Sequence, residues 1–341
     1  MSKGKFVLES ILVCPICKGK LDPLGHEGYK CSACEVIYPI EEGIPIFLRP
    51  NLKEFKRLEA EHHSLTADDY AEAHQLHTLR VNYYHEDFLS AFNFLENADL
   101  ILEVGAGIGK DGLELMKRGF NVVETDVSKG ILIKARESFR SLSRDLSGVY
   151  AVADAECLPF DDDSFDGALI VASLHHLPNP MKFLLEINRC LKDEGTLVIG
   201  FEPNSWQFYT IYAIFRFLRR SWWTLKKVLG NWSRADVFPN KSIADAETLG
   251  YSYWKLKRMV KNANFQPVRI KSVWYVIGFI NLLLEILYRS LRLKRRIELP
   301  LLFEKSIIEI DEKINDLPLL RFFGWHWNVV AKKRVTFEDS Y

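Results

Sequence analysis

Four cysteines near the amino terminus have the residue type and spacing of a metal site. Cys14 and Cys17 form one C-x2-C pair, and Cys31 and Cys34 form a second pair after thirteen intervening residues. Two such pairs can place four thiolates tetrahedrally around one Zn²⁺ ion. A redox dithiol is the alternative, but a redox C-x2-C pair normally occurs singly and opens a helix. Because four thiolates leave no open coordination position, we expect the zinc to be structural.

Glycines indicate a second kind of chemistry, the binding of a nucleotide. Gly105, Gly107 and Gly109 directly follow the aliphatic run Leu100–Val104 and precede a helical segment. Glycines at a strand-to-helix turn let the backbone approach a nucleotide closely. The spacing here is G-x-G-x-G, whereas dinucleotide-binding proteins have G-x-G-x-x-G, so the turn argues against NAD.

Acidic residues end the next two hydrophobic runs, Asp126 the second and Asp154 the third. A carboxylate at the end of a strand is placed to accept hydrogen bonds from ribose hydroxyls. Two more runs follow at residues 165–171 and 195–201, and helical stretches separate all five. Repeated strand–helix units predict an open, mostly parallel sheet that binds its ligand at the carboxyl ends of the strands.

Taken together, the motifs of residues 99–202 resemble those of class I S-adenosylmethionine-dependent methyltransferases. The segments that carry the resemblance are, in chain order, Leu102–Gly109, Thr125–Ser128, Asp154–Asp166 and Ser173–Pro180. The resemblance implies an α/β fold with a Rossmann-like seven-stranded sheet, mostly parallel, whose last strand is antiparallel. It also implies that S-adenosylmethionine is the cofactor and that it is bound by Glu103, Gly105, Ala106, Gly107, Gly109, Asp126, Val127, Asp154 and Ala155.

The same resemblance divides the cofactor among these residues. Glu103 and the glycine turn would hold the methionine part, Asp126 the ribose, and Asp154 with Ala155 the edge of the adenine. One residue departs from the family pattern: Glu124 stands where the family often has a small or apolar residue before the ribose acid.

The segment around the four cysteines resembles the small zinc-ribbon proteins that activate tRNA and release-factor methyltransferases. The resemblance covers Leu8–Leu48 and includes the segment Tyr38–Pro45 after the second cysteine pair. The same ribbon is fused to the amino terminus of some bacterial and archaeal methyltransferases. A piece of this size is too small to fold without its metal.

Three residues are candidates for the chemical step. Methyl transfer from a sulfonium is an in-line displacement, in which the enzyme positions both reactants and can remove a proton from the acceptor. His175 and His176 follow the fourth strand, Glu202 ends the fifth, and each is a candidate base. The alternative for the histidines is that they only pack against the loop or hydrogen-bond to it. No Asn-Pro-Pro-Tyr-like sequence follows the fourth strand, which disfavours methylation of amides or base amines.

Residues 51–98 have the composition of a helical connector. They include His62, His63, His74 and His77, which could form a second metal site. No acidic or cysteine partner follows a clear ligand spacing, so we expect solvated helix residues instead.

Charge is distributed unevenly over the 341 residues. Lys and Arg together number 45, as do Asp and Glu, and this balance excludes a uniformly basic nucleic-acid binder. Residues 201–300 nevertheless carry a net charge of +12 and are rich in aromatic side chains. A basic and aromatic segment suggests an anionic surface as partner. Glu9 interrupts the first apolar run too early for a signal peptide, and clustered cysteines favour a reducing compartment, so we expect a cytoplasmic protein.

Two apolar insertions, residues 203–243 and 274–322, interrupt the core and should meet as a cap over the substrate. Tryptophan and tyrosine beside arginine and lysine at the edge of apolar helices form an interfacial pattern, and neither insertion is a convincing transmembrane helix. We favour docking on the inner face of the membrane; a soluble lid or a dimer face is the alternative. The expected division of the chain is 1–50 zinc ribbon, 51–98 helical connector, 99–202 cofactor core, 203–243 first insertion, 244–273 helix and sixth strand, 274–322 second insertion, and 323–341 last strand and tail.

These observations favour a methyltransferase acting at an oxygen of an amphipathic or lipid-linked acceptor, such as a lipid-borne glycan or a prenylated compound. An RNA methyltransferase is a second interpretation, because rRNA guanine methyltransferases also carry an amino-terminal zinc module, but they need no long apolar insertion. A third is a non-enzymatic scaffold that docks a partner through the ribbon, and the intact cofactor motifs argue against it. The sequence leaves the oligomeric state open.

Overall fold

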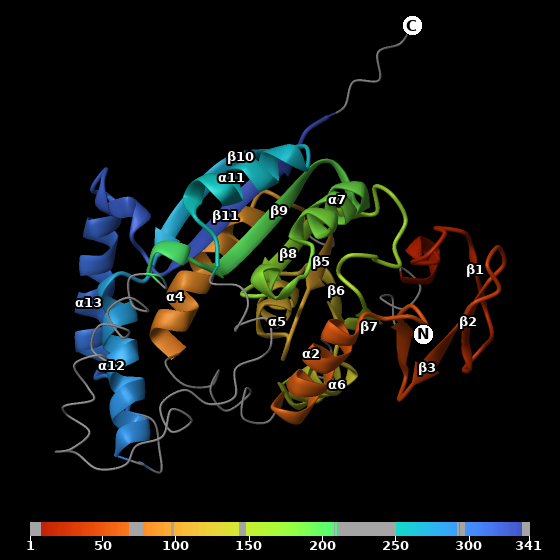
Figure 1. The fold of residues 1–341 in the computed structure, drawn as a ribbon, viewed down its shortest axis with the longest axis horizontal. Helices are drawn as coiled ribbons and strands as arrows, with labels where there is room; N and C mark the ends of the chain where they lie inside the picture. Colours follow the sequence, from red (N-terminus) through yellow and green to blue (C-terminus); the bar gives the residue numbers. More distant parts are fainter. Residues whose placement is uncertain are drawn as a thin grey trace, which may run out of the picture.

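The computed structural model describes residues 8–67, 78–96, 99–142, 148–207, 209, 250–291, 293 and 297–335. Within them, eleven strands form one sheet in the order β1-β2-β3-β4-β7-β6-β5-β8-β9-β11-β10 (Figure 1). The strands are β1 (Leu21–Pro23), β2 (Gly28–Cys31), β3 (Ile37–Glu41), β4 (Ile44–Phe47), β5 (Leu100–Val104), β6 (Asn121–Asp126), β7 (Val149–Ala153), β8 (Phe165–Val171), β9 (Leu191–Pro203), β10 (Phe265–Val273) and β11 (His326–Lys333).

Seven of these strands form the expected core sheet. From β7 through β9 neighbouring strands are parallel, and β11 runs antiparallel to both β9 and β10. The prediction of a mostly parallel sheet with a reversed last strand is therefore confirmed. All five residues of β5 are buried, as expected for a strand covered on both faces.

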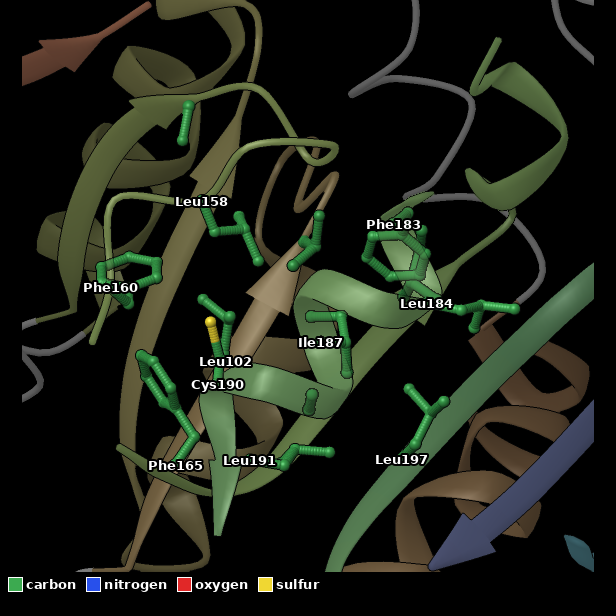
Figure 2. Packing of buried hydrophobic residues seen from close by; sticks show 14 of the residues in the cluster. Leu102, Leu158, Phe160, Phe165, Phe183, Leu184, Ile187, Cys190, Leu191 and Leu197 are labelled. Carbon is green, nitrogen blue, oxygen red and sulfur yellow. The ribbon is translucent and has the colours of Figure 1, made fainter. Parts of the chain in front are cut away.

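Helices cover the two faces of the core sheet. The helices are α2 (Glu54–Leu65), α4 (Thr78–Leu89), α5 (Lys110–Lys117), α6 (Lys129–Leu142), α7 (Pro180–Cys190), α11 (Tyr253–Asn262), α12 (Val276–Ser290) and α13 (Leu301–Asn315), with short 3₁₀ turns η1 (Ser90–Phe92), η2 (Leu174–His176) and η3 (Leu320–Phe322). Side chains of α7 and α11 pack in one hydrophobic cluster, and those of α4, α5 and α6 pack in a second. Figure 2 shows the first cluster, where Phe183, Leu184 and Ile187 of α7 face Leu102 of β5 and Leu197 of β9.

The cysteine-containing ribbon is part of this sheet. Its last strand, β4, pairs in parallel with β7, the edge strand of the core, with Ile46 opposite Val152 and Phe47 opposite Ala153. Lys18 Nζ adds a tie by donating to the Leu158 carbonyl at 2.9 Å and by pairing with Glu186 at 2.8 Å. The sequence pattern did not predict that residues 1–50 would continue the core sheet, because edge pairing leaves no periodic signal.

Two expected boundaries differ from the structure. The fifth core strand begins at Leu191, four residues before the predicted start, because α7 ends at Cys190 and the chain passes directly into β9. In the segment 244–273, for which a helix and a strand are predicted, the described helix is α11, Tyr253–Asn262, and Ser252 caps its amino end by accepting from the Lys255 N–H.

The second insertion, residues 274–322, contains α12 and α13, which pack against each other at the end of the molecule opposite the ribbon (Figure 1). The first insertion, residues 203–243, lies outside the described residues from position 210 onward. None of the helices in the described part of the chain is both long and apolar enough to cross a membrane.

Candidate active site

A pocket of about 500 Å³ opens where the core strands end. Its walls include Val104 and Gly105 after β5, Asp126 at the end of β6 and Asp154 after β7. Because parallel strands place their carboxyl ends at one edge of the sheet, residues far apart in the sequence meet there. The predicted residues that line the pocket are Gly105, Gly107, Asp126, Val127, Asp154, Ala155, His175 and His176. The predicted residues Glu103, Ala106, Gly109 and Glu202 lie outside its lining.

The glycine turn has backbone φ angles that favour glycine. Gly105, Gly107 and Gly109 have φ angles of 67°, 57° and 69°, in the left-handed region that favours glycine. A Cβ atom on Gly105 would lie 2.8 Å from Ser173 Oγ, so a side chain would displace the loop after β8.

Asp126 joins the glycine turn to the next strand. Its Oδ2 accepts from the Gly107 N–H at 3.2 Å, and its Oδ1 accepts from the Ser128 N–H at 2.8 Å. Burial raises the pKa of Asp126, and the N–H groups of Ser128 and Gly107, together with His63 and His176, partly offset this effect. A half-buried carboxylate fixed in this way in the pocket wall fits the predicted contact with ribose hydroxyls.

Asp154 is engaged by cations from the segment before the core. Lys56 Nζ lies 2.6 Å from Asp154 Oδ1 and 3.0 Å from Glu156 Oε2, and Arg49 lies 3.4 Å from Asp154 Oδ2. Burial opposes ionisation of Asp154, but Lys56, the Glu156 N–H and Arg49 together outweigh it and lower the pKa of this carboxyl. Lys56 is itself buried, so α2 is attached to the core at the expected adenine edge of the pocket.

Glu103 lies behind the glycine turn, paired with the unusual Glu124. The two residues are opposite each other on β5 and β6, and both are buried. A Cβ atom on Gly112 would lie 2.5 Å from Glu103 Oε2 and 2.3 Å from Glu124 Oε1, so the two carboxyls approach the same point of α5. Burial raises the pKa of both groups well above the ordinary value, and Glu124 adds to the effect on Glu103.

Glu202 holds the turn that carries the two histidines. It is fully buried and accepts from the N–H groups of Leu174 at 2.7 Å and of His175 at 3.2 Å. Its Oε2 also lies 3.1 Å from His175 Nδ1, so the imidazole of His175 has one nitrogen fixed by a carboxylate. The ring of His176 lies against that of His175, with centroids 4.3 Å apart and planes tilted by 51°.

Helix α2 covers the pocket, and this position of the helix is not predicted from the sequence. Phe55, Lys56, Glu59, His62, His63 and Thr66 all line the pocket. The expectation that these histidines are solvated helix residues is wrong for His62 and His63, because α2 packs on α6 with this face turned inward. Positions 55, 59, 62 and 66 recur every three to four residues, and that spacing was the available signal. His74 and His77 lie outside the described residues.

A further histidine of the site comes from the last strand. His326 begins β11 and lines the pocket beside Phe201, with ring centroids 5.5 Å apart. Burial, reinforced by the neighbouring His175, lowers the pKa of His326 to about 3, so its imidazole is neutral at physiological pH.

The structure has an open α/β sheet with a reversed last strand, a glycine turn after the first core strand, and an acid at the end of each of the next two core strands. These features are typical of methyltransferases of the S-adenosylmethionine-dependent class. Comparison with family models agrees: residues 102–199 match the methyltransferase domain, and residues 5–43 match the Trm112p-like protein family. Residues 102–199 therefore form a methyltransferase domain, and the chain carries a Trm112p-like domain at its amino terminus.

Curated relatives match over part of their length. Demethylmenaquinone methyltransferase of Clavibacter sepedonicus is 41% identical over 99 residues, which are 29% of this chain and 39% of the relative. The C-methyltransferase UbiE of ubiquinone and menaquinone biosynthesis from Blochmanniella pennsylvanica is 29% identical over 188 residues, 53% of this chain and 71% of the relative. The chain thus spans less than half the length of the first of these relatives.

Two solved structures among those that resemble the chain are a Trm112 complex and an N-methyltransferase. The complex of the Haloferax volcanii Trm112 activator with a methyltransferase has a TM-score of 0.45 at 17% identity and covers 80% of this chain and 98% of that chain. Phosphoethanolamine N-methyltransferase 2 of Haemonchus contortus has a TM-score of 0.46 at 17% identity and covers 74% of this chain and 52% of that chain.

Proposed function

We propose that the protein transfers the methyl group of S-adenosylmethionine to an oxygen of an amphipathic or lipid-linked acceptor. The observation that carries this proposal is one pocket in which the glycine turn and Asp126 adjoin the imidazoles of His175, His176 and His326. The first two features suit the adenosyl group, and the imidazoles provide nitrogens that can accept a proton beside the place where an acceptor would lie.

The residues of this chain would position the reactants and accept a proton. Bound S-adenosylmethionine would supply the methyl group: the acceptor oxygen would form a bond to the methyl carbon as the carbon–sulfur bond breaks, with the electron pair passing to sulfur. The acceptor proton goes to an imidazole. His175 suits this role best, because Glu202 beside Nδ1 favours the tautomer with its proton there and leaves Nε2 as the accepting nitrogen.

We further propose that the four cysteines of the ribbon hold a structural Zn²⁺ ion. The Sγ atoms of Cys14 and Cys34 are 3.6 Å apart, and those of Cys17 and Cys31 are 3.4 Å apart. Four thiolates at about 2.3 Å from a tetrahedral ion lie about 3.8 Å from one another, so this cluster needs little adjustment to bind zinc. The ion would cross-link the two knuckles of the ribbon and hold β4 in place.

The second insertion supports an acceptor that is presented at a membrane surface. One face of α12 and the residue just beyond its end expose Phe279, Leu283, Leu287 and Leu291, spaced four residues apart, and α13 adds Leu302, which is 79% exposed. A continuous apolar face of this kind is uncommon on a monomer in water and marks an interaction site. The relatives named for menaquinone and ubiquinone biosynthesis point the acceptor search in the same direction.

Two measurements test the proposal. Calorimetry with S-adenosylmethionine should show binding that Asp126→Asn weakens at least tenfold; absence of binding by the wild-type protein would revive the scaffold interpretation. Transfer of a labelled methyl group should then be assayed with extracted lipids and with total RNA. Label in RNA alone would make the RNA interpretation the leading one. Mass spectrometry of a labelled lipid decides between oxygen and the carbon that the name of the UbiE relative implies.

Membrane docking has its own test in vesicle sedimentation. Leu283→Glu combined with Leu287→Glu should abolish binding to vesicles that contain anionic lipid. Leu185→Glu, at a leucine of α7 that is 53% exposed, is the matched control and should bind as the wild type does. Equal binding by all three proteins would contradict docking through α12.

A further inference from the structure

Three side chains of metal-ligating type converge in the wall of the pocket. Glu59 and His63 lie one helical turn apart on α2, and His176 comes from η2 across the pocket. His176 Nδ1 is 3.2 Å from Glu59 Oε2, and His63 Nε2 is 3.6 Å from the same oxygen. The ligand atoms of all three residues lie within 4.8 Å of one another.

These separations match the dimensions of a metal site. Nitrogen and oxygen ligands at 2.0–2.1 Å from a tetrahedral ion lie about 3.4 Å apart, between the two measured distances. Spacing along α2 contributes to the fit, because residues i and i+4 of a helix project from the same face. Glu59 and His176 are mostly buried, at 6% and 20% side-chain exposure, so an ion there would be shielded from bulk water.

The supporting contacts hold the three residues in place before any ion binds. Glu202 fixes η2 through the backbone of Leu174 and His175, and the ring of His175 packs against that of His176. On the opposite side, the Lys56 ion pairs with Asp154 and Glu156 attach α2 to the core. Ligands whose positions are set by neighbouring hydrogen bonds bind metals more tightly than mobile ones.

We infer that Glu59, His63 and His176 form a second metal site, separate from the four cysteines, for a divalent transition-metal cation. Two imidazoles and one carboxylate suit Zn²⁺, Fe²⁺ or Mn²⁺, and three protein ligands leave a coordination position open for a bound molecule. Thiolate is absent from this set, so the site differs in ligand chemistry from the ribbon.

The role of this ion rests on the proposed methyl transfer. An acceptor hydroxyl in the open position would lose its proton to the His175 imidazole more readily, since a cation lowers the pKa of an oxygen bound to it. The resulting oxyanion would attack the methyl carbon as the carbon–sulfur bond breaks, with the electron pair passing to sulfur. Asp126, the proposed ribose contact, lines the same pocket as Glu59, His63 and His176, so the cofactor would lie beside this site.

Zinc titration of the full chain with its ribbon already loaded tests the inference. The wild-type protein should take up one further equivalent of Zn²⁺ in competition with a chromophoric chelator. His63→Gln and His176→Gln should each weaken this binding at least a hundredfold. His62→Gln is the matched control, because His62 also lines the pocket from α2 but lies outside the triad, and it should retain the second equivalent. Failure of the wild type to bind it, or equal retention in all variants, would overturn the inference.

Cobalt spectra and calorimetry complete the design. Co²⁺ added to the zinc-loaded wild type should give visible absorption bands without the thiolate charge-transfer absorption that a cysteine site would show. Thiolate absorption would count against a site formed by Glu59, His63 and His176. Binding of S-adenosylmethionine is measured on the same samples before the second metal is added. A protein that binds the cofactor but takes up no second equivalent of metal would refute the metal site and leave the proposed methyl transfer standing. A protein that does not bind the cofactor would refute the proposed methyl transfer.

Discussion

Replacing Glu124 with glutamine should stabilise the protein, and the gain should grow as the pH rises. Glu124 is fully buried, and neither of its carboxyl oxygens has a hydrogen-bond partner among the described residues. Burial and the nearby Asp111 carboxylate raise its pKa well above the ordinary value of 4.5. Glutamine has nearly the same shape and cannot ionise, so the substitution removes the cost of keeping a proton on the buried carboxyl and breaks no hydrogen bond.

The size of the effect follows from proton linkage. A carboxyl with a raised pKa keeps its proton in the folded state at pH values where the unfolded chain has released it. Its contribution to stability is complete below the unfolded pKa and is lost as the pH rises toward the folded pKa. One such proton changes the free energy of unfolding by about 1.4 kcal/mol per pH unit. Glu103 and Glu124 interact, so the slope belongs to the pair.

Urea unfolding from pH 5.5 to pH 8.5 measures this slope. The difference in free energy of unfolding between Glu124→Gln and wild type should widen with rising pH, by up to about 1.4 kcal/mol for each unit. Glu137→Gln, at an exposed glutamate of α6, controls for the general loss of a negative charge. A difference that stays constant across this range would show that the buried carboxyl pair does not hold a proton.

Three further outcomes are expected. Gly105→Ala should lower the affinity for S-adenosylmethionine at least tenfold in calorimetry, because the new Cβ atom would meet Ser173. Gly25→Ala is the control: Gly25 has a similar φ angle but open space around it, so the substitution should leave that affinity unchanged. Lys56→Met should destabilise the protein by about 3–5 kcal/mol at pH 7 in urea unfolding, because the buried carboxylates of Asp154 and Glu156 lose the lysine that pairs with both. This loss of stability should shrink on acidification, and a loss that does not depend on pH would contradict the ion-pair explanation. Removal of zinc by a chelator should lower the Tm of ribbon and core in one transition, since β4 pairs with β7; an unchanged core transition would refute the coupling.

The core sheet could be predicted because each of its parts leaves a local signal. Buried parallel strands are continuous aliphatic runs, and Gly105 and Asp126 stand at strand ends where the chain must turn. Asp126, Asp154 and the histidines after β8 meet in the pocket because parallel strands share one edge, and that step follows from topology alone.

The parts that were missed depend on contacts between distant segments. Lys56, His63 and His326 belong to the site only because α2 folds over the pocket and β11 enters the sheet beside β9. Nothing local distinguishes Lys56 from a solvated lysine; only its distance to Asp154 does so. Glu124 was noticed as a departure from the family, but its pairing with Glu103 required the register of β5 and β6.

The position of β4 also bears on the solubility of the protein. An uncovered edge strand presents free N–H and C=O groups and can pair with another chain. β7 would be such an edge without the ribbon, and four of its five residues are buried and apolar. A chain that has not acquired zinc would therefore expose a strand suited to self-association. We expect shortage of zinc to deplete the protein through aggregation, beyond any loss of activity in the molecules that remain folded.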